Sequence, residues 1–119
     1  MHELSVCQDI VLQVERIARE HCARVSAITV KVGPLSGVEG SLLERAYPLA
    51  AAGSSSSNAR LVIDAMPVRV RCRACRRETE TAANRLVCGH CGEWQTDLVS
   101  GDELLLTSVE LEPDPSTLH

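Results

Sequence analysis

The stretch RCRACRRETETAANRLVCGHCGEW, residues 71–94, contains two Cys-x-x-Cys pairs separated by twelve residues. A two-residue gap lets both thiolates of a pair turn onto one metal ion, and two such knuckles supply the four soft ligands of a closed tetrahedral zinc site. The sequence therefore predicts a zinc site made by Cys72, Cys75, Cys88 and Cys91. A closed site leaves the metal no open position, so this zinc is expected to be structural rather than catalytic.

Two other uses of paired cysteines stay open at this point, a redox dithiol and iron–sulfur ligation. Both fit less well, because nothing nearby resembles a redox helix and two symmetric knuckles suit zinc. Gly89 and Gly92 flank the second pair, where knuckle turns need left-handed backbone conformations. The segment from about 69 to 98 has few large apolar side chains, so we expect that it cannot fold on hydrophobic burial alone.

The rest of the chain switches between helical and strand patterns of apolar residues. Helical spacing covers residues 4–23 and a segment that begins near 36, and alternation with period two covers residues 26–32, 60–65 and 103–112. This order predicts an α/β fold in which two helices pack on a small three-stranded mixed sheet. A zinc-ribbon-like module with the four cysteines is inserted between the second and third strands. Cys7 and Cys22 fall in the first helical segment and are expected to be core residues rather than ligands.

We divide the chain accordingly into two domains. Residues 1–68 and 99–119 form a discontinuous α/β domain that carries the predicted nickel site described below, and residues 69–98 form an inserted zinc-binding domain.

Three local expectations concern the second helix and the loop after it. Ser36 and Glu39 have the spacing of a capping box, which predicts that Ser36 caps the helix. Pro48 lies where the helix should continue, which predicts a kink or an early end near Tyr47. The four consecutive serines within residues 53–58 predict a flexible loop.

The charge distribution limits the classes of partner. A net charge of −4 argues against a general phosphate-binding surface, and an aromatic content of 2% leaves few platforms for stacking bases. Arginines nevertheless crowd the cysteines, which keeps open the alternative of a zinc-ribbon nucleic-acid-binding or regulatory module. A simpler explanation is that four thiolates around Zn²⁺ carry a formal charge of −2, which nearby arginines offset. The arginines are Arg69, Arg71, Arg73, Arg76, Arg77 and Arg85.

The sequence also bears on location. No segment approaches the roughly 18 apolar residues that a membrane span needs. The first twenty residues include four acidic side chains among the apolar ones, which a signal peptide does not tolerate. We therefore expect a soluble cytoplasmic protein.

The chain starts with Met1-His2-Glu3. The terminal amine, the His2 amide nitrogen and the His2 imidazole Nδ1 can form adjoining five- and six-membered chelate rings. That arrangement is planar and rich in nitrogen, as Ni²⁺ or Cu²⁺ prefers. Glu3 adds a carboxylate within reach, and a helix beginning near Leu4 should favour the neutral, metal-binding form of the amine. A histidine near the start of a chain carries little weight by itself.

Other segments of the chain give the amino-terminal Met-His-Glu more significance. They are MHELSVC at 1–7, VGPLSGVE at 32–39, the two cysteine pairs, and GDELLLTSVEL at 101–111. In this order they make the chain resemble the HypA/HybF family of hydrogenase nickel-incorporation proteins. The resemblance spans nearly the whole chain, although Pro48 interrupts the second helix where the family usually continues it.

The resemblance implies a nickel metallochaperone and not an enzyme. Members of the family bind Ni²⁺ weakly at the amino-terminal Met-His-Glu and zinc tightly at the four cysteines. They pass nickel to the large subunit of nickel–iron hydrogenase together with a GTPase called HypB, and in some organisms they also serve urease. Carried over to this chain, His2 is the principal nickel ligand, Met1 contributes its amine, and Glu3 is a ligand or a neighbour of one. The implied partners are the hydrogenase large subunit, a HypB-type GTPase and urease accessory proteins, with no nucleic acid and no membrane.

Overall fold

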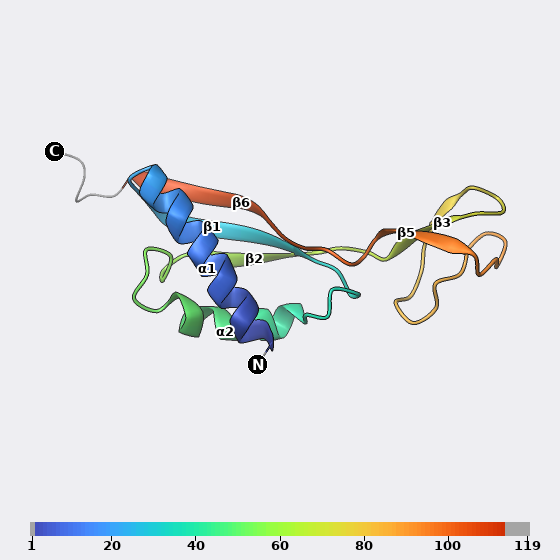
Figure 1. The fold of residues 1–119 in the computed structure, drawn as a ribbon, viewed down its shortest axis with the longest axis horizontal. Helices are drawn as coiled ribbons and strands as arrows, with labels where there is room; N and C mark the ends of the chain where they lie inside the picture. Colours follow the sequence, from blue (N-terminus) through green and yellow to red (C-terminus); the bar gives the residue numbers. More distant parts are fainter. Residues whose placement is uncertain (1, 114–119) are drawn as a thin grey trace.

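The computed structural model describes residues 2–113, apart from the side chain of His2. Two helices and six strands follow one another along this part of the chain (Figure 1). They are α1 (His2–Glu20), β1 (Ala23–Val32), α2 (Gly40–Ala51), β2 (Arg60–Ala65), β3 (Arg69–Cys72), β4 (Glu78–Glu80), β5 (Thr96–Ser100) and β6 (Leu104–Pro113).

A mixed three-stranded sheet in the order β2-β1-β6 forms one end of the molecule. β1 runs parallel to β2, with Val30 opposite Ile63, and antiparallel to β6, with Ile28 opposite Val109. The parallel pair is possible because the chain crosses back between the two strands through α2. Both helices pack on this sheet (Figure 1), which confirms the predicted fold class.

The core between the helices and the sheet is largely aliphatic, since the chain has no Phe, although Tyr47 adds an aromatic ring to it. Burial of each Val, Leu or Ile side chain contributes about 1.5–3 kcal/mol, so this packing holds the α/β part together. The buried side chains lie at helical spacing on the two helices and alternate along β1. They are Cys7, Ile10, Val11, Val14 and Ala18 from α1, Val25, Ile28, Val30 and Val32 from β1, and Leu43, Tyr47 and Ala51 from α2.

The two cysteines expected in the core have different positions. Cys7 is fully buried, and its Sγ donates to the Leu43 carbonyl oxygen at 3.4 Å, which ties α1 to α2. Cys22 is exposed, so its placement in the core is wrong. The reason is that α1 ends at Glu20, before the helical apolar pattern does, and Cys22 turns the chain into β1 with a positive φ of 49°.

The predicted capping of α2 by Ser36 is also wrong. The N-cap is Glu39, and no side chain caps this helix. Ser36 Oγ instead accepts a hydrogen bond from the Val38 amide at 3.2 Å, which closes a local turn. Gly37, at a φ of 83°, bends the chain within that turn, so the helix starts only at Gly40.

Pro48 does not end α2, which continues to Ala51. Proline has no N–H, so the Glu44 carbonyl loses its partner within the helix. Both residues are exposed, and water can satisfy that carbonyl. The buried residues Leu43 and Tyr47 hold the helix from the opposite face. The early end expected near Tyr47 is therefore wrong.

The serine-rich segment 53–58 is anchored by hydrogen bonds, in contrast to the flexible loop expected there. Ser56 is fully buried, and its carbonyl oxygen accepts the Tyr47 hydroxyl at 3.0 Å. The amide and the hydroxyl of Ser55 both donate to the Glu15 carboxylate, at 2.6 and 2.8 Å. The loop is thus joined to both helices.

The cysteine segment forms a second sheet, antiparallel, in the order β4-β3-β5. It lies at the far end of an elongated molecule of 63 × 28 × 16 Å (Figure 1). We call residues 69–100 the four-cysteine module. Its fully buried side chains are few, Val70 and Cys72 among them. The division of the chain into a discontinuous α/β domain and an inserted metal-binding domain remains a proposal.

A pair of glycines holds the crossing between the module and the α/β part. A Cβ atom on Gly33 would overlap the carbonyl group of Gly101, so the two backbones touch. The Leu35 amide donates to the Gly101 carbonyl at 2.7 Å, and the Gly33 amide donates to the Glu103 carbonyl at 2.8 Å. Gly101 itself has a φ of 121°, a conformation that only glycine adopts easily. This close approach fixes the path by which the chain returns from the module into β6.

Candidate metal centres

The four cysteines converge on one point in the four-cysteine module. Their Sγ atoms all lie within 4.8 Å of one another, and two of the separations, Cys72–Cys91 and Cys75–Cys88, are 3.6 Å. Four sulfurs at about 2.3 Å from a tetrahedral Zn²⁺ would be about 3.8 Å apart. The geometry therefore fits a single zinc ion with no open coordination position, and it favours one metal ion over a separate redox dithiol.

The two knuckles repeat one backbone pattern. In each, the amide of the first cysteine donates to the carbonyl five residues later, at 2.9 Å. Its own carbonyl accepts the amide four residues later, at 3.0 Å in the first knuckle and 2.9 Å in the second. The residue after the second cysteine has a positive φ in both, 64° for Arg76 and 78° for Gly92. The sequence did not lead us to pair these two residues, although aligning the two Cys-x-x-Cys motifs does so.

Backbone amides surround the first sulfur of each pair. Two amides donate to it, at 3.3 Å in the first knuckle and 3.4 Å in the second. The Cys91 amide lowers the pKa of the Cys88 thiol to about 6, and the Cys75 amide lowers the pKa of Cys72. Because the thiolate is the form that binds metal, these amides prepare one ligand in each knuckle for zinc.

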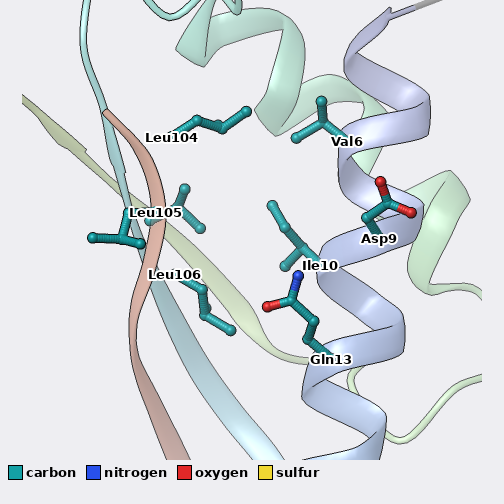
Figure 2. Close-up of a pocket in the computed structure, with 8 residues that line it drawn as sticks. Val6, Asp9, Ile10, Gln13, Leu104, Leu105 and Leu106 are labelled. Atoms are coloured by element: carbon teal, nitrogen blue, oxygen red, sulfur yellow. The ribbon is translucent and has the colours of Figure 1, made fainter. Parts of the chain in front are cut away.

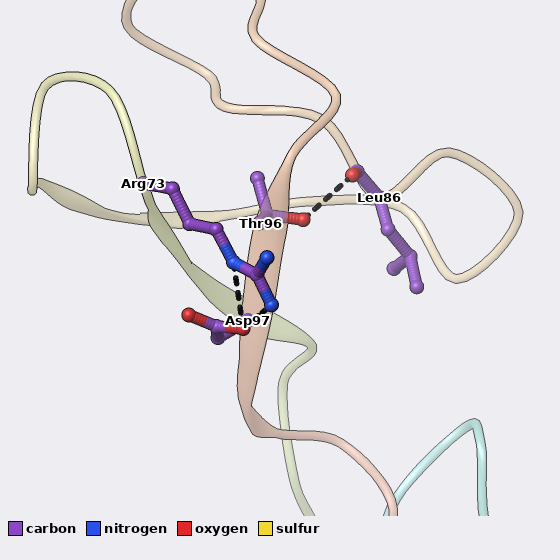
Figure 3. A network of polar contacts seen from close by, with 4 residues as sticks. All are labelled: Arg73, Leu86, Thr96 and Asp97. Atoms are coloured by element: carbon purple, nitrogen blue, oxygen red, sulfur yellow. Dashed lines mark hydrogen bonds and ion pairs between the residues drawn. The ribbon is translucent and has the colours of Figure 1, made fainter.

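Two of the six arginines near the cysteines form ion pairs with carboxylates. The Arg73 guanidinium binds the Asp97 carboxylate through Nε at 3.1 Å and Nη2 at 2.7 Å (Figure 3). Arg71 binds Glu78 at 2.8 Å, across β3 and β4. Both pairs are solvent-exposed and contribute little to stability. These two arginines are therefore offset locally, besides any effect on the charge of a bound metal.

Another link holds β5 to the knuckle loop. The Thr96 hydroxyl donates to the Leu86 carbonyl at 2.9 Å, and Figure 3 shows this bond on the side of β5 away from Arg73.

Two of the three predicted nickel-binding residues, His2 and Glu3, begin α1, on the α/β part (Figure 1). Met1 and the side chain of His2 lie outside the described residues, so the ligand set remains a prediction. The helix begins at His2, and the first four N–H groups of a helix have no acceptor within it. The His2 amide is therefore not needed for a helical hydrogen bond. Glu3 is half-buried in the first turn, where the helix dipole favours a carboxylate.

A groove of about 280 Å³ lies between α1 and β6 (Figure 2). Its walls are mostly apolar, with Ile10 and Leu106 on facing elements, and Asp9 and Gln13 lie on the α1 side. Asp9 is the one carboxylate among the lining residues, so the groove offers neither a metal-ligand set nor an acid–base pair. Within the described part of the chain, the four cysteines are the one group of three or more His, Cys, Asp or Glu side chains placed to share an ion.

None of the helices that the structure describes is both long enough and apolar enough to cross a membrane.

Comparison with known proteins gives one consistent result. Residues 1–111 match the family model described as hydrogenase/urease nickel incorporation, metallochaperone, HypA. The hydrogenase maturation factor HypA of Nitrosospira multiformis is 48% identical over 112 residues, which cover 93% of this chain and 97% of that protein. The protein of the same name from Aquifex aeolicus is 36% identical over 115 residues, which cover 96% and 100% of the two chains.

Solved structures agree with this result. The solution structure of the Ni metallochaperone HypA from Helicobacter pylori matches with a TM-score of 0.66 at 24% identity, over 94% of this chain and 98% of that one. A second solution structure of a HypA protein matches with a TM-score of 0.72 at 26% identity, over 96% and 98% of the two chains.

Proposed function

This chain belongs to the HypA family of hydrogenase maturation factors, and from that membership we propose that it is a nickel metallochaperone. It binds Ni²⁺ at its amino terminus through Met1, His2 and Glu3 and delivers the ion for maturation of nickel–iron hydrogenase. The match over residues 1–111, which includes both the start motif and the cysteine pairs, is the observation that carries this proposal. The protein itself catalyses no reaction.

The two metals have separate roles in this proposal. Zinc is held by Cys72, Cys75, Cys88 and Cys91, and the closed sulfur geometry supports a permanent, structural ion. The scarcity of buried apolar side chains in the four-cysteine module supports the same role, because the metal then supplies the stability that burial does not. Nickel binds at the start of α1, on the α/β part, where ligands at a chain terminus can release it more readily.

The partners follow from the family. We propose that the chain acts in the cytoplasm with the large subunit of a nickel–iron hydrogenase and a HypB-type GTPase, and that urease accessory proteins are further candidates. The family model names both hydrogenase and urease, which supports including urease.

A nickel titration of zinc-loaded protein without any tag tests the binding site. The His2→Ala variant should lose stoichiometric nickel binding and keep its zinc. The matched control is His21→Ala, since His21 is an exposed histidine just beyond the other end of α1, and its ring forms a hydrogen bond with the nearby Ile17 carbonyl at 2.9 Å. That variant should bind nickel normally. Unchanged nickel affinity in His2→Ala would contradict the proposed ligand set.

A maturation assay tests the delivery function. In a host that lacks its own copy of this protein, the wild-type chain should restore nickel-dependent hydrogenase activity, and His2→Ala should not. Because excess nickel in the medium can bypass a delivery protein, the assay is made at limiting nickel and repeated at high nickel. Full activity with His2→Ala at limiting nickel would refute the proposal.

A further inference from the structure

The two halves of the four-cysteine site are anchored differently. Cys72 is the last residue of β3, so the first knuckle continues a strand of the module's sheet. The second knuckle lies within residues 81–95, a segment that the structure describes throughout and in which the only strand-like pairing is an isolated bridge between Ala82 and Arg85. Because one metal ion needs both knuckles in a fixed place, the second knuckle requires contacts that hold it against the sheet.

Two threonine side chains make such contacts, one from each outer strand of that sheet. The Thr79 hydroxyl oxygen, on β4, accepts a hydrogen bond from the Gly89 amide at 2.9 Å. The Thr96 hydroxyl, on β5, donates to the Leu86 carbonyl at 2.9 Å (Figure 3). Gly89 follows Cys88 directly and Leu86 precedes it by two residues, so the two hydroxyl groups hold the chain on both sides of this ligand.

The first knuckle has a different acceptor at the equivalent position. Arg73 there takes the place of Gly89, directly after the first cysteine, and its amide donates to the backbone carbonyl of Gln95 at 3.0 Å. The corresponding amide of the second knuckle donates to the Thr79 hydroxyl. A side chain therefore does in the second knuckle what the backbone does in the first, and this makes the residue type at position 79 important.

Gly89 supports the same interpretation. Its φ is not positive, in contrast to the left-handed conformation expected for it, so the turn itself does not require glycine at this position. A Cβ atom on Gly89 would lie 3.3 Å from the Thr79 Cβ, which is closer than such atoms usually approach. The missing side chain thus lets the knuckle come near enough to the threonine for the hydrogen bond.

We propose that Thr79 and Thr96 are positioning residues for the zinc site, whose hydroxyl groups fix the second knuckle where its two cysteines complete the metal coordination. This inference rests on the proposal that the four cysteines bind zinc. Few side chains of the module are buried, and the other side-chain contact of this knuckle to the sheet side is the exposed one between Arg77 and His90 at 3.3 Å. The two threonine hydrogen bonds therefore form together with metal binding, and their free energy adds to the zinc affinity.

Zinc competition with a chromogenic chelator tests the proposal on the untagged full chain. Thr79→Val keeps the shape of the side chain and removes the hydroxyl, so the zinc affinity should fall about fivefold, the effect of one hydrogen bond. Thr96→Val should have an effect of similar size. Thr79→Ser keeps the hydroxyl and should restore the wild-type affinity, which would not happen if this threonine served only to pack its methyl group.

Thr81→Val is the matched control. Thr81 lies two residues further along the same segment, and its buried Oγ1 has no hydrogen-bond partner among the residues described. This variant should bind zinc as tightly as the wild type or more tightly. The helical circular dichroism signal follows the α/β part separately, and we expect it to disappear at the same urea concentration in all four variants.

Three results would overturn the proposal. The first is wild-type zinc affinity in Thr79→Val or in Thr96→Val. The second is an equal loss in Thr79→Val, Thr79→Ser and Thr81→Val, which would assign the effect to side-chain packing. In both cases the wild-type chain still binds zinc, so the four-cysteine assignment and the nickel proposal would stand. The third is a wild-type chain that binds no zinc, which would contradict the four-cysteine assignment as well.

Discussion

The replacement Gly33→Ala should loosen the crossing at which the four-cysteine module joins the α/β part. The new methyl group would overlap the Gly101 carbonyl, and backbone cannot rotate away as a side chain can. Relief requires the two segments to separate, which weakens the hydrogen bonds of 2.7 and 2.8 Å that Leu35 and Gly33 donate across the crossing. Two hydrogen bonds at about 1 kcal/mol each, with about 0.5 kcal/mol regained from the stiffer unfolded chain, leave a loss of about 1.5 kcal/mol before any strain. Overpacking strain adds about 1 kcal/mol or more.

Urea denaturation of the zinc-loaded protein, followed by far-ultraviolet circular dichroism, measures this loss. The matched control is Gly37→Ala in the same loop, where no atom lies within 4 Å of an added Cβ and only the φ of 83° opposes the side chain. That cost is about 1 kcal/mol. We therefore expect Gly33→Ala to be less stable than Gly37→Ala by about 1 kcal/mol or more. Equal stability of the two variants would refute the argument that backbone contact fixes this crossing.

Three further predictions test other parts of the fold. Tyr47→Phe removes the buried hydrogen bond to the Ser56 carbonyl and should lower the free energy of unfolding by about 1 kcal/mol in urea; no change would show that the serine loop is not held there. Pro48→Ala restores an N–H donor to the Glu44 carbonyl and should raise the melting temperature by an amount equivalent to about 1 kcal/mol. A lower melting temperature would contradict the conclusion that Pro48 costs α2 a hydrogen bond. Cys72→Ser should lose bound zinc, as measured by elemental analysis, and the four-cysteine module should become sensitive to limited proteolysis while the helical signal of the α/β part persists. The reason is that bound zinc stabilises small domains by about 10–16 kcal/mol. Retained stoichiometric zinc would contradict the assignment of Cys72 as a ligand.

Periodicity was enough to predict the α/β part, because its elements are long and each buries one face. The alternation of Ile28, Val30 and Val32 predicts a strand with one buried side, and these residues are buried. Cysteine spacing was enough to place four sulfurs together, since a two-residue gap constrains the knuckle locally.

The errors occurred where a tertiary feature outweighed a local rule. Ser36 has the right spacing for a capping box, but Gly37 turns the chain before the helix begins. Pro48 is a helix breaker by local rules, yet it lies on the exposed face, where the lost hydrogen bond costs least. Cys22 continues the helical spacing of apolar residues, but the helix itself ends earlier, at Glu20.

Other features depend on contacts between residues far apart in sequence. The backbone contact between Gly33 and Gly101 joins two segments that are far apart in sequence and meet only in the folded chain. The ion pair between Arg73 and Asp97 and the positive φ of Arg76 are likewise set by the folded module and not by local sequence. The sequence alone does not separate arginines that form ion pairs from those that do not, because the carboxylate partners of Arg71 and Arg73 lie on other strands.

The central claim is that the transferable nickel and the structural zinc occupy different sites. Nickel-edge X-ray absorption of the untagged protein, loaded with one equivalent each of zinc and nickel, tests it most directly because the spectrum distinguishes sulfur from nitrogen and oxygen ligands. The account predicts a nickel shell of nitrogen and oxygen alone in the wild-type protein, and loss of that bound nickel in His2→Ala. A shell containing sulfur would place nickel at the cysteines and contradict the account.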